Sequence, residues 1–254
     1  MRTVTALLGL SGLVSSVSGD TCDEEKYAST GLPCLEIPRC DDSNTTASLN
    51  INTLSSGSGP SQSNSVVSFC FNDNYMFVTH EAYKQTLFTD PGYTECGDDV
   101  FTSNVAEMFI APNMEKVNHC YNELDISPFN IMFNAGIYNP NLNQTGIEGS
   151  PFPCEDTGVC YQATMNPTDN SWTAKISVSF ALLNCPYNCP LTKRYCGHTW
   201  ANAVYRANFF RINELTETSH CSSDTCEYMA WSPTFATPPA FHIPSQFGYL
   251  LPQL

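Results

Sequence analysis

The segment that decides the fold is 172–180, which reads Trp-Thr-Ala-Lys-Ile-Ser-Val-Ser-Phe. Every second residue from Trp172 to Phe180 is apolar, and each residue between them is Thr, Lys or Ser. Successive side chains of a β-strand point to opposite faces, so a strand here has one apolar face and one polar face. The segment therefore predicts a strand that packs on a core with one side and meets water with the other.

The same period-two pattern returns along the chain. Asn72, Asp73 and Asn74 form a turn signal between two such runs, and 17 prolines and 14 glycines punctuate the rest. We expect further strands over residues 66–71, 75–83, 105–110, 121–127, 131–138 and 203–212. Helical periodicity is weak, with at most a short turn over 180–184. Many short strands between turn signals predict an all-β fold, an antiparallel β-sandwich of the jelly-roll-like kind.

The chain divides into three parts by composition. Residues 1–19 have the form of a signal peptide, with Arg2 before an apolar run and small residues up to Gly19. That run is too short to span a bilayer, so we expect a secreted, extracellular product. Residues 20–64 are predicted to be a cysteine-rich cap ending in a Ser/Gly-rich loop or linker over 55–64. Residues 65–254 are predicted to form the sandwich domain.

The 13 cysteines all follow the predicted signal peptide. A secreted chain so rich in cysteine is typical of a disulfide scaffold, and the odd number leaves one thiol free or paired between chains. The connectivity stays open at this point. Two sequons, at Asn44 and Asn143, predict N-glycosylation.

The charge balance is acidic, with 25 Asp and Glu residues against 10 Lys and Arg. Nucleic acids and anionic membranes bind clusters of basic side chains, and the chain has no such cluster. We therefore expect neither nucleic acid nor membrane as a partner. An acidic surface is compatible with calcium and with neutral sugars.

Six segments carry short motifs in a fixed order. They are FNDNYMFV at 71–78, AEMFIAP at 106–112, YNELDISP at 121–128, WTAKISVSFALL at 172–183, YRANFFR at 205–211, and WSPT with FHIPSQFG at 231–234 and 241–248. Together they resemble the family 9 carbohydrate-binding modules first known as appendages of xylanases, over about residues 66–250. The cysteines and residues 20–64 lie outside this resemblance.

The resemblance implies a β-sandwich that binds a sugar in a slot between two aromatic rings, without catalysis. Aromatic rings cover the apolar faces of a sugar, while polar groups select its hydroxyls. Carried over by motif, the rings are Phe101 and Phe241, the acid is Glu107, and a polar partner is Asn208. Both rings are Phe where characterised binders have Trp. The strand that holds Arg and Asn in those binders has Asp125 and Ser127 here.

The residues themselves suggest a second part of the site. Tyr121, Glu123, Asp125 and Ser127 alternate along one predicted strand and so share one face. An aromatic ring beside two carboxylates suits hydroxyl recognition or calcium, and an ordinary solvated face is the alternative. For Phe101 and Phe241 the alternative is core packing.

Glu107 lies in an otherwise apolar strand and needs a partner, which Arg206 or Arg211 could supply. No cofactor motif is present in the sequence. Members of the family carry structural calcium, which implies a possible ion in the loop 88–104. The acidic residues of that loop are Asp90, Glu95, Asp98 and Asp99.

The sequence thus favours a secreted, non-catalytic protein that binds a polysaccharide or a sugar terminus, of the kind that assists polysaccharide breakdown. Three alternatives stay open. The first is a matrix or cell-wall sandwich that has lost its ligand. The second is a glycoside hydrolase with Glu107 and Glu123 as its two carboxylates. The third is a haem-binding sandwich, for which no motif points to a pair of axial ligands.

Overall fold

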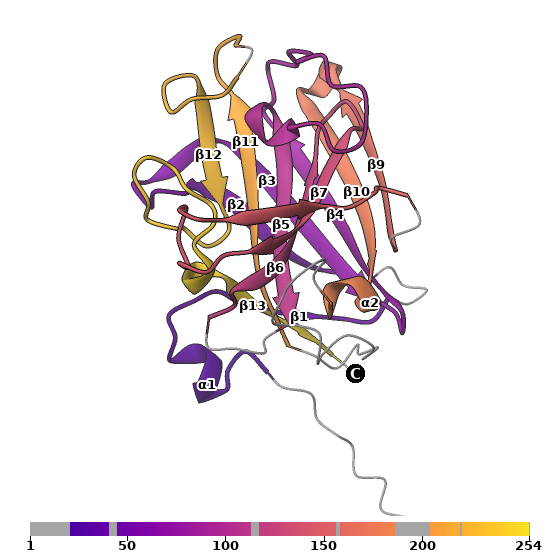
Figure 1. Cartoon of the computed structure of the whole chain (residues 1–254), viewed down its shortest axis with the longest axis vertical. Helices are drawn as coiled ribbons and strands as arrows, with labels where there is room; N and C mark the ends of the chain where they lie inside the picture. Colours follow the sequence, from indigo (N-terminus) through magenta and orange to yellow (C-terminus); the bar gives the residue numbers. More distant parts are fainter. Residues whose placement is uncertain are drawn as a thin grey trace, which may run out of the picture.

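The structure is a computed structural model, and it describes residues 21–40, 45–112, 117–155, 158–185, 204–218 and 220–253. Figure 1 shows its strands, which make up most of the described chain. The predicted signal peptide at 1–19 and the sequon at Asn44 lie outside the described residues. Within the described ranges, no helix is long and apolar enough to cross a bilayer.

The described elements are thirteen strands, two one-turn helices and three 3-10 turns. The strands are β1 Cys34–Ile37, β2 Ala47–Leu54, β3 Pro60–Phe71, β4 Tyr75–Tyr83, β5 Val105–Pro112, β6 Cys120–Ile126, β7 Met132–Tyr138, β8 Glu148–Pro151, β9 Val159–Asn166, β10 Ser171–Ser179, β11 Tyr205–Glu214, β12 Cys226–Ala230 and β13 Gly248–Pro252. The helices are α1 Glu25–Ala28 and α2 Phe180–Leu183, and the turns are η1 Val100–Thr102, η2 Pro167–Asp169 and η3 Pro244–Gln246.

The strands pair in the order β8-β7-β6-β5-β11-β12-β2-β3-β4-β10-β9, and every pair in this order is antiparallel. β13 pairs with β11 and, in parallel, with β1. This long sheet curls so that its two halves face each other. The predicted all-β, antiparallel fold is confirmed, and all seven predicted strands are present.

β10 carries the alternation seen in the sequence. Trp172, Ala174, Ile176 and Val178 are buried, while the residues between them are partly or fully exposed. The strand ends one residue earlier than predicted, because Phe180 begins α2. The side chain of Ser179 accepts a hydrogen bond from the backbone N–H of Leu182 and so caps this helix.

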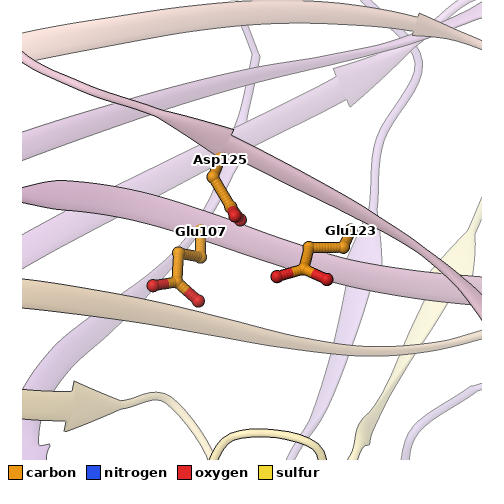
Figure 2. A group of neighbouring side chains, drawn as sticks. All are labelled: Glu107, Glu123 and Asp125. Carbon is orange, nitrogen blue, oxygen red and sulfur yellow. The ribbon is translucent and has the colours of Figure 1, made fainter. Parts of the chain in front are cut away.

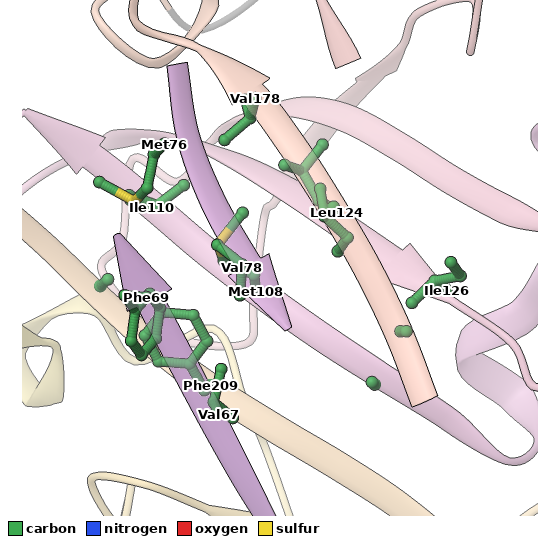
Figure 3. Close-up of a cluster of buried hydrophobic side chains, with 14 of the residues drawn as sticks. Val67, Phe69, Met76, Val78, Met108, Ile110, Leu124, Ile126, Val178 and Phe209 are labelled. Carbon is green, nitrogen blue, oxygen red and sulfur yellow. The ribbon is translucent and has the colours of Figure 1, made fainter. Parts of the chain in front are cut away.

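The main core lies between the two halves of the sheet (Figure 3). β3 and β4 contribute residues such as Phe69 and Val78 from one half. β5 and β6 contribute Met108 and Leu124 from the other half. Because side chains alternate along a strand, the remaining residues of β5 and β6 point to the opposite, outer face.

That outer face is also covered. Every residue of β5, β6 and β11 is buried, since a second apolar cluster packs over them. This cluster contains Phe109 and Tyr121 together with Phe241 and Phe247 from the C-terminal segment. The prediction of a wet face on residues 121–127 is therefore wrong, because the chain after β12 folds back over this strand.

The prediction that residues 55–64 form a loop or linker is wrong in its second half. β3 already begins at Pro60, and its Ser63 and Ser65 are buried. The carboxylate of Glu227 accepts hydrogen bonds from the backbone N–H of Gln62 and from the N–H and hydroxyl of Ser63. Polar residues can thus begin a strand of the sheet, and a buried serine is tolerated there because a distant residue satisfies its hydrogen bonds.

The expected disulfide scaffold is present. Four bonds join Cys22 to Cys34, Cys40 to Cys70, Cys96 to Cys154 and Cys221 to Cys226. Cys120 and Cys185 are also disulfide-bonded. Among the described cysteines Cys160 is free and exposed.

His80 in β4 is buried among apolar residues, with its ring stacked on Trp172 at 6.3 Å. Burial, helped by the charge of Arg211, lowers the pKa of His80 from 6.5 to about 3. The unfolded chain takes up this proton below pH 6.5 and the folded chain does not, so His80 lowers stability as the pH falls. We expect His80→Phe to gain ~2 kcal/mol of unfolding free energy relative to the wild type between pH 7 and pH 5, by denaturant titration.

The matched control is Val78→Ala, because Val78 is buried in the same strand and its replacement removes no titratable group. Its difference from the wild type should stay the same at both pH values. A pH-independent difference for His80→Phe would contradict the prediction.

Candidate functional site

A cavity of about 330 Å³ lies on the outer face of β5 and β6. Its walls come from widely separated parts of the chain: η1, β7, the segment around β8, β12 and the segment before η3. The lining is mostly apolar, with two carboxylates, one amide, one imidazole and one phenol. The lining residues are Phe101, Glu107, Phe109, Glu123, Phe133, Ile137, Gln144, Ile147, Gly149, Ile212, Tyr228, Pro239, Ala240, Phe241 and His242.

The two predicted aromatic walls, Phe101 and Phe241, both line this cavity. Phe101 is half-buried in η1, and its ring meets the ring of Phe133 edge to face at 5.1 Å. Phe241 stacks on Phe210 at 4.1 Å with an interplanar angle of 10°. Phe241 is only 8% exposed. One of its faces thus belongs to the packed outer cluster, as the core-packing alternative predicted.

Three carboxylates lie together beside the cavity (Figure 2). Glu107 of β5 is directly opposite Asp125 of β6, and Glu123 lies two residues before Asp125 on the same face. Each residue offers a carboxylate oxygen within 4.8 Å of the others. Glu107 and Glu123 line the cavity, whereas Asp125 is fully buried and does not line it.

Burial dominates the electrostatics of this cluster. It raises the pKa of Glu123 to about 7. It also raises the pKa values of Glu107 and Asp125 well above their ordinary values, and the neighbouring charge of Glu123 adds to both shifts. In the part of the chain that the structure describes, no Lys, Arg or His forms an ion pair with any of the three. Each carboxyl group therefore needs either a proton or another positive partner.

The expectation that Arg206 or Arg211 pairs with Glu107 is wrong. Arg206 donates hydrogen bonds to the backbone carbonyls of Phe247 and Pro244. Side chains alternate between the two faces along β11, and Arg211 points to the inner face of the sheet, away from the acidic cluster. Neither guanidinium is directed at the acidic cluster.

Tyr121 and Asn208 do not line the cavity, although both were predicted to contact sugar. The hydroxyl of Tyr121 is hydrogen-bonded to Nδ1 of His242 at 2.8 Å and accepts from Asn139 at 3.3 Å. The amide of Asn208 donates to the carbonyl of Ser232 and accepts from its N–H. Both side chains are fully buried, and their hydrogen bonds connect segments of the protein behind the cavity.

Several lining residues were not predicted from the sequence. The polar ones are His242, Gln144 and Tyr228. Burial lowers the pKa of His242 to about 4, so its imidazole is neutral at physiological pH. His242 follows Phe241 within the matched FHIP motif, which was the available signal. Gln144 is the middle residue of the predicted sequon that begins at Asn143. The side chain of Asn143 is exposed, and this residue directly precedes the lining residue Gln144 in the chain.

The acids of the loop 88–104 are not gathered around one point. The carboxylate of Asp98 accepts hydrogen bonds from the backbone N–H groups of Thr94 and Glu95, and that of Asp90 accepts from Gly92. Among the described residues, the one group of three potential metal ligands is Glu107, Glu123 and Asp125. The structure therefore argues against a calcium site in the loop 88–104.

Three solved structures have a similar fold, and each is described in connection with carbohydrate. A protein from Bacteroides uniformis assigned to carbohydrate binding superposes with a TM-score of 0.61 at 13% identity, covering 87% of this chain and 99% of that one. This chain therefore shares the fold of that protein. A family 9 module from Caldicellulosiruptor kristjanssonii in complex with cellotriose has a TM-score of 0.54 at 10% identity, covering 87% and 94%. The same module in complex with glucose has a TM-score of 0.55 at 11% identity, covering 87% and 96%.

An extracellular protein of Arthroderma benhamiae is 26% identical over 159 residues, which are 60% of this chain. The match spans 64% of that protein, less than two thirds of its length. No family model matches the chain.

Proposed function

We propose that this chain is a secreted, non-catalytic protein that binds the terminal sugar of a polysaccharide or oligosaccharide in the cavity of Phe101 and Phe241, as a relative of the family 9 modules. The observation that carries the proposal is the lining of that cavity, where two aromatic side chains distant in sequence meet two carboxylates. Its volume of about 330 Å³ is at the small end of ligand sites, which suits a single sugar unit.

The chemistry of the lining fits a pyranose ring. The C–H faces of a sugar are apolar and pack on aromatic rings, while its hydroxyl rim needs donors and acceptors. Phe101 and Phe241 supply the apolar walls. Glu107, Glu123 and the amide of Gln144 supply polar atoms for the hydroxyls. Asp125, Tyr121 and Asn208 act from behind this lining by orienting its walls.

Secretion is supported by three observations. The described chain holds four disulfides, which form and persist in oxidising compartments. The matched part of the Arthroderma benhamiae protein belongs to an extracellular protein. Residues 1–19 have the form of a signal peptide. Retention on an extracellular polysaccharide would place the chain where it assists enzymes that degrade that polysaccharide.

The hydrolase alternative is disfavoured by the placement of the acids. A glycoside hydrolase needs its two carboxylates on either side of the scissile bond. Glu107 and Glu123 instead rise from adjacent strands on one wall of the cavity. We therefore expect binding without cleavage.

The test is the binding of purified full-length protein to arrayed plant and algal polysaccharides, followed by calorimetry with the oligosaccharide of the best one. We expect Phe101→Ala to weaken binding about 10-fold, ~1.4 kcal/mol, because the sugar loses one stacking face. The matched control is Phe235→Ala, since Phe235 is 64% exposed and does not line the cavity. Its affinity should equal that of the wild type.

Two results would contradict the proposal. If no polysaccharide is retained, the chain is a structural sandwich without a sugar ligand. If the wild type releases reducing sugar and Glu107→Gln does not, the chain is a hydrolase.

A further inference from the structure

The spacing of the acidic cluster matches the coordination shell of one ion. Glu107, Glu123 and Asp125 offer oxygens within 4.8 Å of one another. Calcium holds its oxygen ligands at about 2.4 Å, so two oxygens on the same ion lie at most ~4.8 Å apart. The three oxygens can therefore share one calcium ion with little movement.

The burial of these oxygens is a second, independent indication of a ligand. Oε1 of Glu107, which is 3% exposed, has no hydrogen-bond partner among the described residues. Asp125 is 0% exposed, and its carboxyl group meets no N–H or hydroxyl donor among them; its hydrogen bond is to the carboxyl group of Glu123, inside the cluster. Figure 2 shows the carboxylate of Asp125 directed toward the space between Glu107 and Glu123. A buried carboxylate without a partner destabilises the folded state, and a bound cation would offset this.

The donor set selects the kind of cation. All three ligands are carboxylates, and hard oxygen donors favour calcium or magnesium over zinc and copper. Magnesium requires oxygens at about 2.0–2.1 Å, so two of them lie at most ~4.2 Å apart. Calcium accepts wider and less regular oxygen spacings and more ligands than magnesium, so we assign the cluster to calcium.

The position of the cluster gives the ion access to the cavity. Glu107 and Glu123 line the cavity, while Asp125 closes the cluster from behind. We propose that Glu107, Glu123 and Asp125 bind one calcium ion at the floor of the cavity and that two neighbouring sugar hydroxyls complete its coordination. Calcium takes six to eight oxygens, more than three carboxylates need supply, so positions facing the cavity stay available. The second half of this inference rests on the proposed sugar-binding function.

The first test uses Ca²⁺ alone. Full-length protein treated with a chelator is titrated with Ca²⁺ by calorimetry, and its thermal unfolding is followed with and without the ion. We expect one ion per chain and a higher melting temperature with Ca²⁺, because a ligand that binds only the folded state stabilises it. Asp125→Asn should bind Ca²⁺ at least 10-fold more weakly and lose the rise in melting temperature.

The matched control is Asp99→Asn in the loop 88–104, where Asp99 is exposed. Its Ca²⁺ affinity should be that of the wild type. The cation site is overturned if millimolar Ca²⁺ gives neither heat nor stabilisation in the wild type, since the carboxyls then carry protons instead. It is equally overturned if Asp99→Asn abolishes binding while Asp125→Asn keeps it.

The second test separates the ion from the sugar function. The sugar affinity of the wild type is measured in Ca²⁺ and in EDTA, and we expect it to be at least 10-fold weaker in EDTA. The affinity of Asp125→Asn should be equally weak in both buffers. Sugar binding that is equal in Ca²⁺ and EDTA would overturn the role of the ion while the proposed function stands. Ca²⁺ binding without any sugar binding would uphold the ion site and remove the proposed function.

Discussion

Replacing Arg211 by Met is expected to lower the free energy of unfolding by about 3–5 kcal/mol, because it removes the donor that joins three strands inside the sandwich. Arg211 is fully buried in β11. Its Nη1 donates to the backbone carbonyls of Asn64 in β3 and Tyr83 in β4, at 2.7 and 2.9 Å. Its Nη2 donates to the side-chain oxygens of Gln85 and Asn213, each at 3.0 Å.

The cost arises mainly from the acceptors that remain. A methionine fills much of the volume but leaves buried carbonyl and amide oxygens without donors, at about 1–3 kcal/mol for each that water cannot reach. The measurement is denaturant unfolding at pH 7 with the disulfides intact. The matched control is Arg39→Met, since Arg39 pairs with Asp73 at the surface and its side chain is 44% exposed. That change should stay within ~0.5 kcal/mol, and a similarly small effect for Arg211→Met would contradict the prediction.

Phe209→Ala is expected to lower the free energy of unfolding by about 3–5 kcal/mol as well. Phe209 is 1% exposed and packs edge to face on Phe69 at 5.0 Å, which links β11 to β3 across the core (Figure 3). It also contacts the ring of Trp231 at 5.9 Å. Removing the ring loses its buried apolar area and leaves a cavity between layers that cannot easily close.

The comparison of Phe209 with its neighbour separates stability from binding. Phe209→Ala should leave the sugar affinity of the folded protein unchanged, because its side chain lies on the core face. Phe210→Ala should lower sugar affinity, because Phe210 supports Phe241 from behind at 4.1 Å. The exposed Phe235→Ala should change neither quantity by more than ~0.5 kcal/mol. Equal losses of sugar affinity in Phe209→Ala and Phe210→Ala would contradict this division of roles.

The two faces of β5, β6 and β11 explain why the sandwich can carry a site without losing its core. The inner face packs against the other half of the sheet, and the outer face holds the cavity, its aromatic walls and the acidic cluster. Buried carboxylates on the inner face would have to be paired within the core. On the outer face, Glu107 and Glu123 reach a cavity where a sugar or an ion can satisfy them.

Sequence reasoning predicted the elements better than their surroundings. The alternation in 172–180 depends only on the geometry of a strand, so β10 was recognised correctly. The same reasoning failed for 121–127, because a strand buried on both faces has no wet side. It also failed for Pro60–Asn64, where polar residues begin a strand of the sheet and Ser63 is buried with its hydrogen bonds made to Glu227.

The site was predicted in part. Motif resemblance selected Phe101, Glu107 and Phe241, and all three line one cavity. The spacing of Glu123 and Asp125 was enough to place both on one face of a strand. The partners of Glu107 were predicted wrongly, because they depend on which strand lies beside β5 and in which register.

By itself the sequence determined the class of fold, the disulfide character, and two aromatic walls and two carboxylates of the cavity, since local alternation, cysteine content and short motifs need no knowledge of distant contacts. Only the tertiary structure decided which cysteines pair, which polar residues are buried, and that Glu107 faces Asp125. These depend on strand register and on the return of the C-terminal segment over β6. Both result from contacts between residues far apart in the chain, which no local pattern encodes.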